Sequence, residues 1–278
     1  MSRGTNYGPK PWLQAHWDLR AAANFILGGT GTGLLLAAAL AAPPAWRWPL
    51  AAGMALIAAG LGAVWLEIGR KLRAINVLFN ARTSWMTREA YVAVVVFALG
   101  LAGLALGRAP LAQAAALAAL GFVYCQGRIL FAAKGIPAWR TRGVVALIVT
   151  TALAEGGGLF VAAAIPALGA PPTPWLIAFA LVLVARVAAW SRYRTRLGSG
   201  PANAALEASG RILIYAGTAA PLALLAIGLM LPALAPSADL LAGLAALGAG
   251  WRLKFVLVRR AAYNQGFSLP QLPVRGGH

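Results

Sequence analysis

The chain has 278 residues, of which 60% are hydrophobic and only 11% are charged, and its formal net charge at pH 7 is +18. Soluble globular domains are closer to half apolar and a quarter charged, so this composition excludes an ordinary soluble domain and is typical of a polytopic membrane protein. The basic residues form short clusters between apolar runs, which argues against nucleic-acid binding. The single cysteine, Cys125, excludes a disulfide framework or a cysteine-ligated iron–sulfur cluster within the chain.

Eight apolar runs follow one another along the chain, each close to the roughly 20 residues that a membrane-spanning helix needs. They cover residues 21–42, 48–67, 88–107, 110–132, 143–166, 173–190, 210–232 and 237–257. The segment before the first run is too long and too polar for a signal-peptide n-region, so we expect it to be retained. The sequence therefore predicts an all-α fold with eight transmembrane helices. We expect the chain to form a single integral-membrane domain over residues 1–278, with one half at about 21–132 and the other at 143–257.

The distribution of charge predicts the orientation of these spans. All but two of the 24 lysine and arginine residues fall in segments that would lie on one side of the membrane, and only Arg47 and Arg108 would lie on the other. Because positively charged loops stay in the cytoplasm, both termini are expected there.

Haem, metal and hydrolytic chemistry are not expected. Haem b in a membrane usually takes two histidine ligands from helices, but the two histidines here are His16 and His278, the last residue of a polar tail. Histidine, cysteine and carboxylate residues do not cluster with the spacing of a metal site, and no Ser–His–Asp or Cys–His set is available.

The six acidic residues are the main candidates for chemistry, because ionisable groups within spans are costly and usually functional. Asp18 precedes the first span, Glu67 ends the second and Glu89 begins the third, so all three are expected at one depth on the cytoplasmic side. Glu155 lies in the middle of a span, ahead of three glycines. The other two, at positions 207 and 239, are expected in solvated loops.

Each of these acids also has a simpler structural interpretation. Thr87 could cap the third helix while Glu89 complements the helix dipole in its first turn. Glu67 could pair with a basic residue one turn further on, and Asp18 could form a surface ion pair. Glu155 could be protonated and hydrogen-bonded to a neighbouring helix. The tryptophans near the span ends are typical interfacial anchors.

Four stretches resemble a known family: "WDLRAAANFILGGTGTG" (17–33), "EIGRKLRAINVLFNARTSW" (67–85), "SWMTREA" (84–90) and "GRILFAAKGIPAW" (127–139). They are similar to the membrane anchor subunits of DMSO reductase-type molybdoenzymes, relatives of the polysulfide reductase (NrfD-like) anchors. Within that family the chain looks most like the membrane subunit assigned to phenylacetyl-CoA:acceptor oxidoreductase. The family typically has His-Leu-Gly where this chain has Glu67-Ile68-Gly69.

The resemblance implies a quinone-reactive anchor without haem or iron–sulfur cluster, in the cytoplasmic (inner) membrane of a bacterium or archaeon. It implies two partners on the cytoplasmic face, a ferredoxin-like iron–sulfur subunit and a molybdopterin catalytic subunit. The reaction of that partner would be phenylacetyl-CoA oxidation or a DMSO reductase-like reaction. The quinone, menaquinone or ubiquinone, would bind in the first helices.

The residues themselves support this interpretation, since a quinol must lose two protons as its electrons leave, and its pocket needs an acceptor for them. Glu89 and Glu67 are the expected proton-transferring carboxylates. Arg88 is expected to keep Glu89 charged. Further quinone contacts are expected from Arg88, Asp18, His16 and Trp85.

A secondary transporter is the alternative function. The glycine-rich runs "GGTGTG" and "EGGG" could break two spans around a mid-membrane substrate site at Glu155. Against this alternative, the other candidate acids gather at one surface, and the second half of the chain lacks a matching break with an acid.

Overall fold

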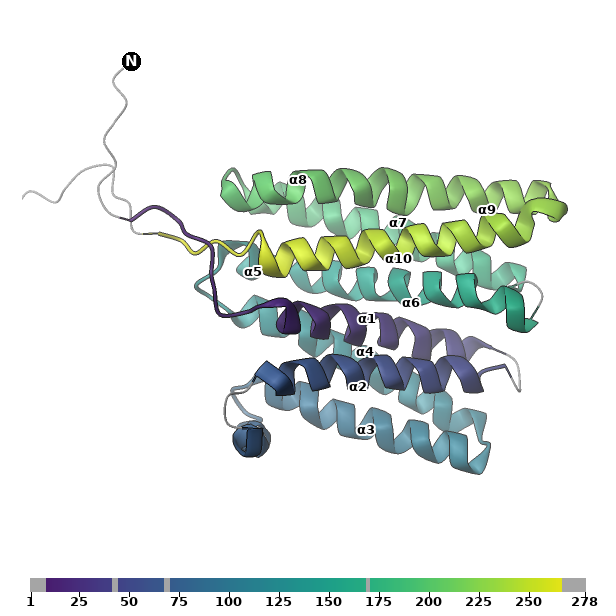
Figure 1. Cartoon of the computed structure of the whole chain (residues 1–278), viewed down its shortest axis with the longest axis horizontal. Coiled ribbons are helices and arrows are strands. Elements are labelled where there is room, and N and C mark those ends of the chain that lie inside the picture. The colour runs from purple at the N-terminus through teal and green to yellow at the C-terminus, as the bar shows by residue number, and fades with distance from the viewer. Residues whose placement is uncertain (1–8, 42–44, 68–70, 169–170, 267–278) are drawn as a thin grey trace, which may run out of the picture.

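Long helices lying side by side along one axis form the protein in a computed structural model, which describes residues 9–41, 45–67, 71–168 and 171–266 (Figure 1). The α-helices are α1 (Leu19–Leu40), α2 (Arg47–Glu67), α3 (Trp85–Leu106), α4 (Ala109–Ala132), α5 (Pro137–Arg140), α6 (Val144–Leu168), α7 (Thr173–Leu197), α8 (Pro201–Ile214), α9 (Ala220–Met230) and α10 (Ala235–Arg259). Two 3₁₀-helices, η1 (Lys71–Phe79) and η3 (Pro232–Leu234), and a π-helical turn, η2 (Tyr215–Ala219), complete the described elements.

All eight predicted spans correspond to helical segments long and apolar enough to cross a membrane, which confirms the all-α, polytopic architecture. The seventh segment consists of α8, η2 and α9 without interruption, and the eighth of η3 and α10. Two predicted boundaries are wrong: α7 continues to Leu197 instead of ending at 190, and α8 begins at Pro201 instead of 210. Arginine is a good helix former, so the helix continues through "SRYRTRL" although the apolar run has ended.

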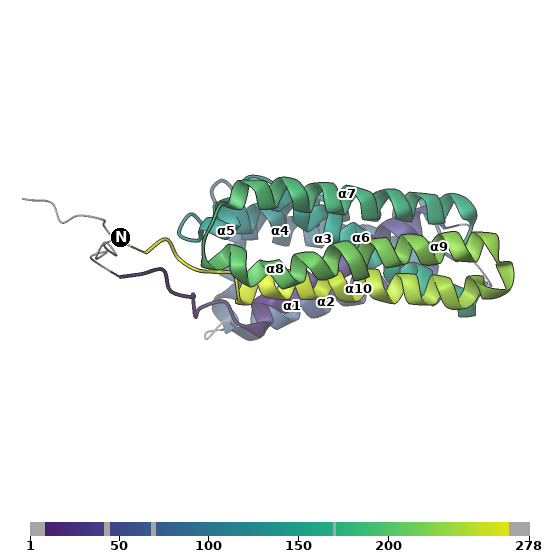
Figure 2. The same ribbon diagram turned by 90° about the horizontal axis from the view of Figure 1, so that it is seen from above.

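Helix α1 lies at the centre of the bundle and packs against α2, α4, α6 and α10 (Figures 1 and 2). Its glycines allow this close approach. Gly31 faces Gly53 of α2 and Gly33 faces Gly156 of α6, and a Cβ atom added at any of these four positions would collide with the backbone of the other helix. Small residues at helix contacts are typical of membrane bundles, where close packing replaces hydrophobic association. The "GGTGTG" run is therefore a packing surface inside a continuous helix.

The described ends of the chain meet at one end of the bundle (Figure 2). Leu13 forms an antiparallel bridge with Tyr263, and the backbone N–H of Gln14 donates to the carbonyl of Ala262. An even number of spans requires the ends to lie on the same side, as predicted. The cytoplasmic location of that side remains a prediction from the charge distribution.

Candidate functional site

The predicted acids of the first three spans come together at the end of the bundle that carries the chain ends. Helix α1 begins there, α2 ends there and α3 begins there, and η1 crosses beside them at an angle to the bundle axis (Figure 1). Ile68, Gly69 and His278 lie outside the described residues, as does Arg70, a basic residue one turn after Glu67.

A cavity of about 340 Å³ lies between these helix ends. Its wall contains both predicted proton-transferring residues, Glu67 from α2 and Glu89 from α3, together with Asn24 of α1. The remaining wall is apolar: Trp17, Ala21, Phe25, Leu61, Val64, Trp65, Val77, Met86, Ala90 and Ile129. We call this space the Glu89 cavity. It fits the expectation that two carboxylates from separate spans share one site.

Glu89 is held deep in the wall of this cavity. Glu89 is only 5% exposed. Nδ2 of Asn24 donates to Oε1 of Glu89 at 3.4 Å. Gln126 of α4, fully buried, donates from Nε2 to the carbonyl of Asn24 at 3.0 Å. The buried oxygens Oδ1 of Asn24 and Oε1 of Gln126 have no hydrogen-bond partner among the described residues. These two amide oxygens are buried acceptors, and of the two residues only Asn24 belongs to the cavity wall.

Asn24 and Gln126 were not predicted as site residues. The prediction rested on ionisable residues within spans, whereas both of these are neutral amides within apolar runs. An uncharged amide in a span is also expensive to bury without partners, so its presence is a signal that could have identified them.

Arg88 does not contact Glu89, contrary to the expectation that it keeps this carboxylate charged. Because successive residues of a helix point about 100° apart, Arg88 and Glu89 project from α3 in different directions. The Arg88 guanidinium bonds the carbonyls of Ala81 and Arg82 at 2.9 and 2.8 Å and lies 4.1 Å from the centre of the Trp85 ring. Neither Arg88 nor Trp85 is among the residues that line the Glu89 cavity.

Trp85 forms part of a stack beside the cavity. The guanidinium of Arg128 lies 4.5 Å from its ring centre, so that two arginines contact one indole, and Tyr124 meets it edge-on at 5.9 Å. Such cation–π contacts fix the start of α3 against the end of α4. Trp85 therefore packs between the start of α3 and the end of α4, and the quinone contact expected from it stays a prediction.

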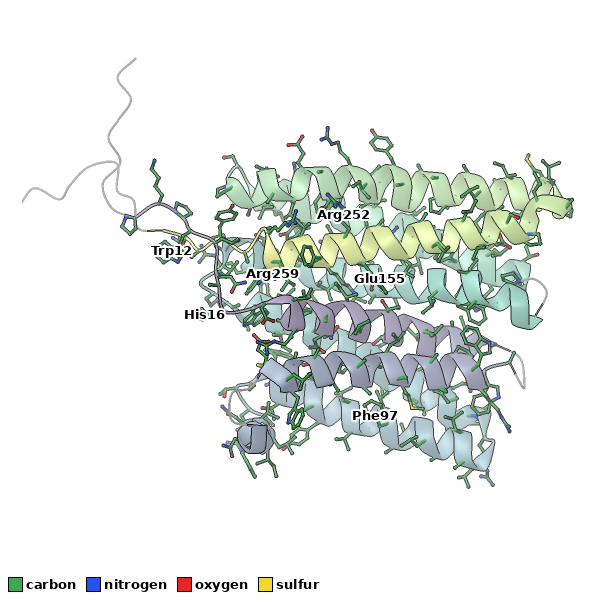
Figure 3. The ribbon with its side chains drawn as sticks, in the orientation of Figure 1. Trp12, His16, Phe97, Glu155, Arg252 and Arg259 are labelled. Atoms are coloured by element: carbon green, nitrogen blue, oxygen red, sulfur yellow. The ribbon has the colours of Figure 1, made fainter. Side chains whose placement is uncertain are left out.

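Asp18 and His16 lie near the cavity without lining it. Asp18 caps α1, accepting from the backbone N–H of Arg20 at 2.7 Å, and pairs with its guanidinium at 2.8 Å. The hydrogen bond from Arg20 lowers the pKa of the Asp18 carboxyl below its usual range. His16 is exposed at the end of the bundle (Figure 3), while the next residue, Trp17, lies in the cavity wall.

Thr87, the alternative cap considered for the third helix, does not cap it. Helix α3 begins at Trp85, and Ser84 caps it by accepting from the backbone N–H of Thr87 at 3.3 Å. The Thr87 hydroxyl instead donates to the carbonyl of Val77, and the Tyr91 hydroxyl donates to the carbonyl of Leu78. These bonds tie η1 to α3 and hold Val77 in the cavity wall.

The remaining acids lie elsewhere. Glu155 is fully buried in α6 and forms a 2.6 Å ion pair with Lys254 of α10. Asp239 was expected in a solvated loop but belongs to α10 and is only 3% exposed, because this helix starts four residues earlier, at Ala235. Glu207 is exposed as expected, but on α8 and not in a loop.

No protein-family model matches the chain, and no curated protein matches it significantly. Among the described residues, no group of three or more histidine, cysteine or acidic side chains could hold a metal ion.

Proposed function

We propose that this protein is the quinone-reactive membrane anchor subunit of a molybdopterin and iron–sulfur oxidoreductase, and that the Glu89 cavity is its quinone site. The observation that carries the proposal is the pairing of Glu67 and Glu89 in one otherwise apolar cavity at the end of a membrane-type bundle. An apolar space with a few convergent polar groups is the usual form of a small-molecule site.

The dimensions and lining of the cavity suit the ring of a quinone. A volume of about 340 Å³ lies near the lower limit of ligand pockets and suits a single small ring system. The side chains of Trp17, Phe25 and Trp65 offer apolar and aromatic surface to such a ring. Asn24 is the one neutral polar side chain in the described wall and places an amide beside such a ring.

The two carboxylates supply the proton chemistry. When a quinol is oxidised, both of its O–H bonds break, two protons pass to acceptors and two electrons leave. Glu89 takes one of these protons and Glu67 can take the other, with the reverse transfers when a quinone is reduced. Asn24 orients the Glu89 carboxylate through its 3.4 Å hydrogen bond.

The partners follow from the resemblance in sequence and from the position of the cavity. It lies at the end of the bundle where η1 and the chain ends are found, so electrons have a short path to a protein docked there (Figure 1). We propose an iron–sulfur subunit on this face, on the cytoplasmic side of the inner membrane, with a molybdopterin subunit beyond it. The complex would oxidise phenylacetyl-CoA or carry out a DMSO reductase-like reaction.

Replacing Glu89 tests this proposal. The complex is purified through a tag on this chain, checked for iron–sulfur and molybdopterin partners, and assayed for quinone-linked turnover. Glu89→Gln is expected to lower the rate by roughly 100-fold or more, because general acid–base groups contribute on that order. Quinone binding, measured by quenching of tryptophan fluorescence, should change much less, since the amide keeps the shape of the carboxyl.

The exposed residue Glu207 provides the matched control, because Glu207→Gln removes the same charge far from the cavity. Unchanged turnover in Glu89→Gln, or purification of the chain without either partner, would contradict the proposal.

The structure disfavours the transporter alternative. That alternative needs spans broken at their glycines, but α1 and α6 are continuous helices through "GGTGTG" and "EGGG". Gly156 packs directly against Gly33 of α1, and Glu155 forms an ion pair with Lys254.

A further inference from the structure

Three ionisable side chains lie together inside the bundle, away from the Glu89 cavity. They are Glu155 of α6, Lys254 of α10 and Arg186 of α7, all 0% exposed. We call them the buried triad. Figure 3 shows Glu155 within the bundle, between its two ends. Charged groups at this depth are costly in a membrane protein, and they usually face the bundle interior where they perform a function.

Only one of the two carboxylate oxygens of Glu155 is hydrogen-bonded. Oε2 of Glu155 accepts from Nζ of Lys254 at 2.6 Å and from the hydroxyl of Thr30 at 3.1 Å. Trp251 in turn donates from its indole N–H to the Thr30 hydroxyl at 2.9 Å. The other carboxylate oxygen, Oε1, is buried without a hydrogen-bond partner among the described residues. A purely structural ion pair would be expected to satisfy both oxygens.

Arg186 adds a second positive charge without a carboxylate of its own. Its guanidinium donates to the carbonyls of Ala246 and Gly217, and to the hydroxyl of Thr218, the last at 3.2 Å. Its Nε atom has no partner in the described part of the chain. Gly217 and Thr218 belong to the π-helical turn η2. Such turns are rare and occur frequently at functional sites.

The backbone is shaped around these groups. A Cβ atom at Gly29 would collide with Nζ of Lys254, and one at Gly250 would collide with the Glu155 carboxyl group. Neither the Glu89 cavity nor a smaller apolar groove of about 170 Å³ lined by α1, α6 and α7 includes a member of the triad. The site is therefore closely packed, and a proton is the ligand that fits it.

Two cations and one carboxylate leave one positive charge in excess within the triad. The other helices that pack against α6 do not neutralise it: α1 contributes only the hydroxyl of Thr30. The charged residues of α1 and α4, Arg20 and Arg128, are engaged at the end of the bundle. Loss of one proton would make the triad neutral, which lowers the cost of burying it.

We propose that the Glu155–Lys254 pair, beside the fixed charge of Arg186, is a proton-binding site inside the membrane domain. In the loaded state Lys254 is an ammonium and Glu155 a carboxylate. On release, one N–H bond of the ammonium breaks, the proton passes to water and Lys254 remains as a neutral amine. Nζ of Lys254 also donates to the carbonyl of Phe25 at 2.9 Å, and Phe25 belongs to the wall of the Glu89 cavity.

Nitrogen-15 NMR of the lysine side chains tests this site directly. The chain has four lysines, Lys10, Lys71, Lys134 and Lys254, so the full-length protein in lipid bilayers should give few signals, and Lys254→Met assigns the relevant one. We expect the Lys254 signal to interconvert reversibly between ammonium and amine forms as the pH is changed while the protein stays folded. A Lys254 signal that remains ammonium throughout would overturn the proposal.

Two variants sharpen the test. Glu155→Gln should lower the midpoint of this interconversion by about one pH unit or more, because it removes the partner charge at 2.6 Å. If that variant does not fold, Thr30→Val removes a competing donor from the Glu155 carboxylate and should shift the midpoint by less and in the opposite direction. Glu207→Gln serves as the control. An equal shift in the control would contradict the assignment, and since neither quinone nor partner is used, the result is independent of the proposed function.

Discussion

At the scale of single residues, the helix starts at the cavity end show how similar polar side chains take different roles. Ser84 and Asp18 each cap a helix by accepting a backbone N–H. Glu89 follows Ser84 by five positions and is carried by α3 into the cavity wall, where Asn24 meets it. Position within the first turns therefore separates a capping residue from a residue available for chemistry.

The Asp18–Arg20 pair predicts a small pH dependence of stability. The pKa of Asp18 is lowered in the folded protein by Arg20. Its stabilising contribution is therefore fully present above the ordinary aspartate pKa of about 3.9 and is lost as the pH falls through the lowered value. We expect wild type to be slightly more stable than Asp18→Asn at neutral pH and the difference to vanish in acid, measured by thermal unfolding in detergent.

Arg20→Gln provides the control for this pair. In that background the pH-dependent effect of Asp18→Asn should be smaller, because the side-chain hydrogen bond and charge of Arg20 are absent and the capping bond from the backbone N–H remains. A difference between wild type and Asp18→Asn that grows in acid would show that the pair does not act as described.

At the scale of elements, the contact between α1 and α6 holds the two halves of the bundle together. Gly33 and Gly156 let the two backbones touch, and further along the same helices Thr30 bonds Glu155. Close backbone approach and a polar bond between helices are the two ways in which membrane helices associate. The seam should therefore be sensitive to added volume.

Gly156→Val is expected to destabilise the protein by about 1–3 kcal/mol or more, the usual cost of overpacking. The added carbon atoms would meet the backbone at Gly33 and Leu34, which cannot move aside as a flexible side chain could. Gly62→Val introduces the same side chain where a Cβ meets nothing within 4 Å, and should change stability by less than about 1 kcal/mol. Equal effects of the two substitutions on thermal unfolding would disprove the close contact.

At the scale of the whole molecule, the two ends of the bundle differ. One end carries the described chain ends, α5, η1 and the Glu89 cavity, while the other carries the turn between α3 and α4 and the short helix η3 (Figures 1 and 2). Large apolar side chains such as Val94, Leu101, Leu181 and Val184 are exposed along the sides, as expected for contact with lipid.

Cysteine labelling tests which end faces the cytoplasm. Arg47 and Arg140 are both exposed, and lie at opposite ends of the bundle. We expect Arg47→Cys, but not Arg140→Cys, to react with a membrane-impermeant reagent added from outside intact cells, because the positive-inside rule assigns Arg140 to the cytoplasm. The native Cys125 is buried and should not react. The opposite labelling pattern would reverse the topology and place the cavity on the outer side.

Much of the architecture could be predicted because a membrane span is a local property. About 20 apolar residues suffice to define one, whatever lies elsewhere in the chain. The boundaries at Leu197 and Pro201 were missed because a helix can continue into water after its apolar run has ended. Asp239 was misplaced although it lies within the eighth apolar run, because an acidic side chain near a span end was taken to be solvated.

The candidate site could be predicted only in part. Glu67 and Glu89 were identified because charge is rare in this chain, and both line the cavity. Arg88 was assigned to Glu89 because the two are adjacent in sequence, yet helix geometry points them apart and Arg88 bonds loop carbonyls instead. Asn24 was overlooked because the prediction rested on ionisable residues, and its contact with Glu89, 65 positions away, exists only in the folded bundle.

The sequence by itself determined the class of the molecule, the number of spans and the acids available for chemistry, because composition and hydropathy act over short stretches of chain. Only the tertiary structure decided which polar groups meet. Glu155 and Lys254 are 99 positions apart and become partners because the glycines of α1 and α10 let three helices pack closely around them. In a bundle with so few charged residues, a buried charge is costly without a partner, and helix packing decides which groups can meet.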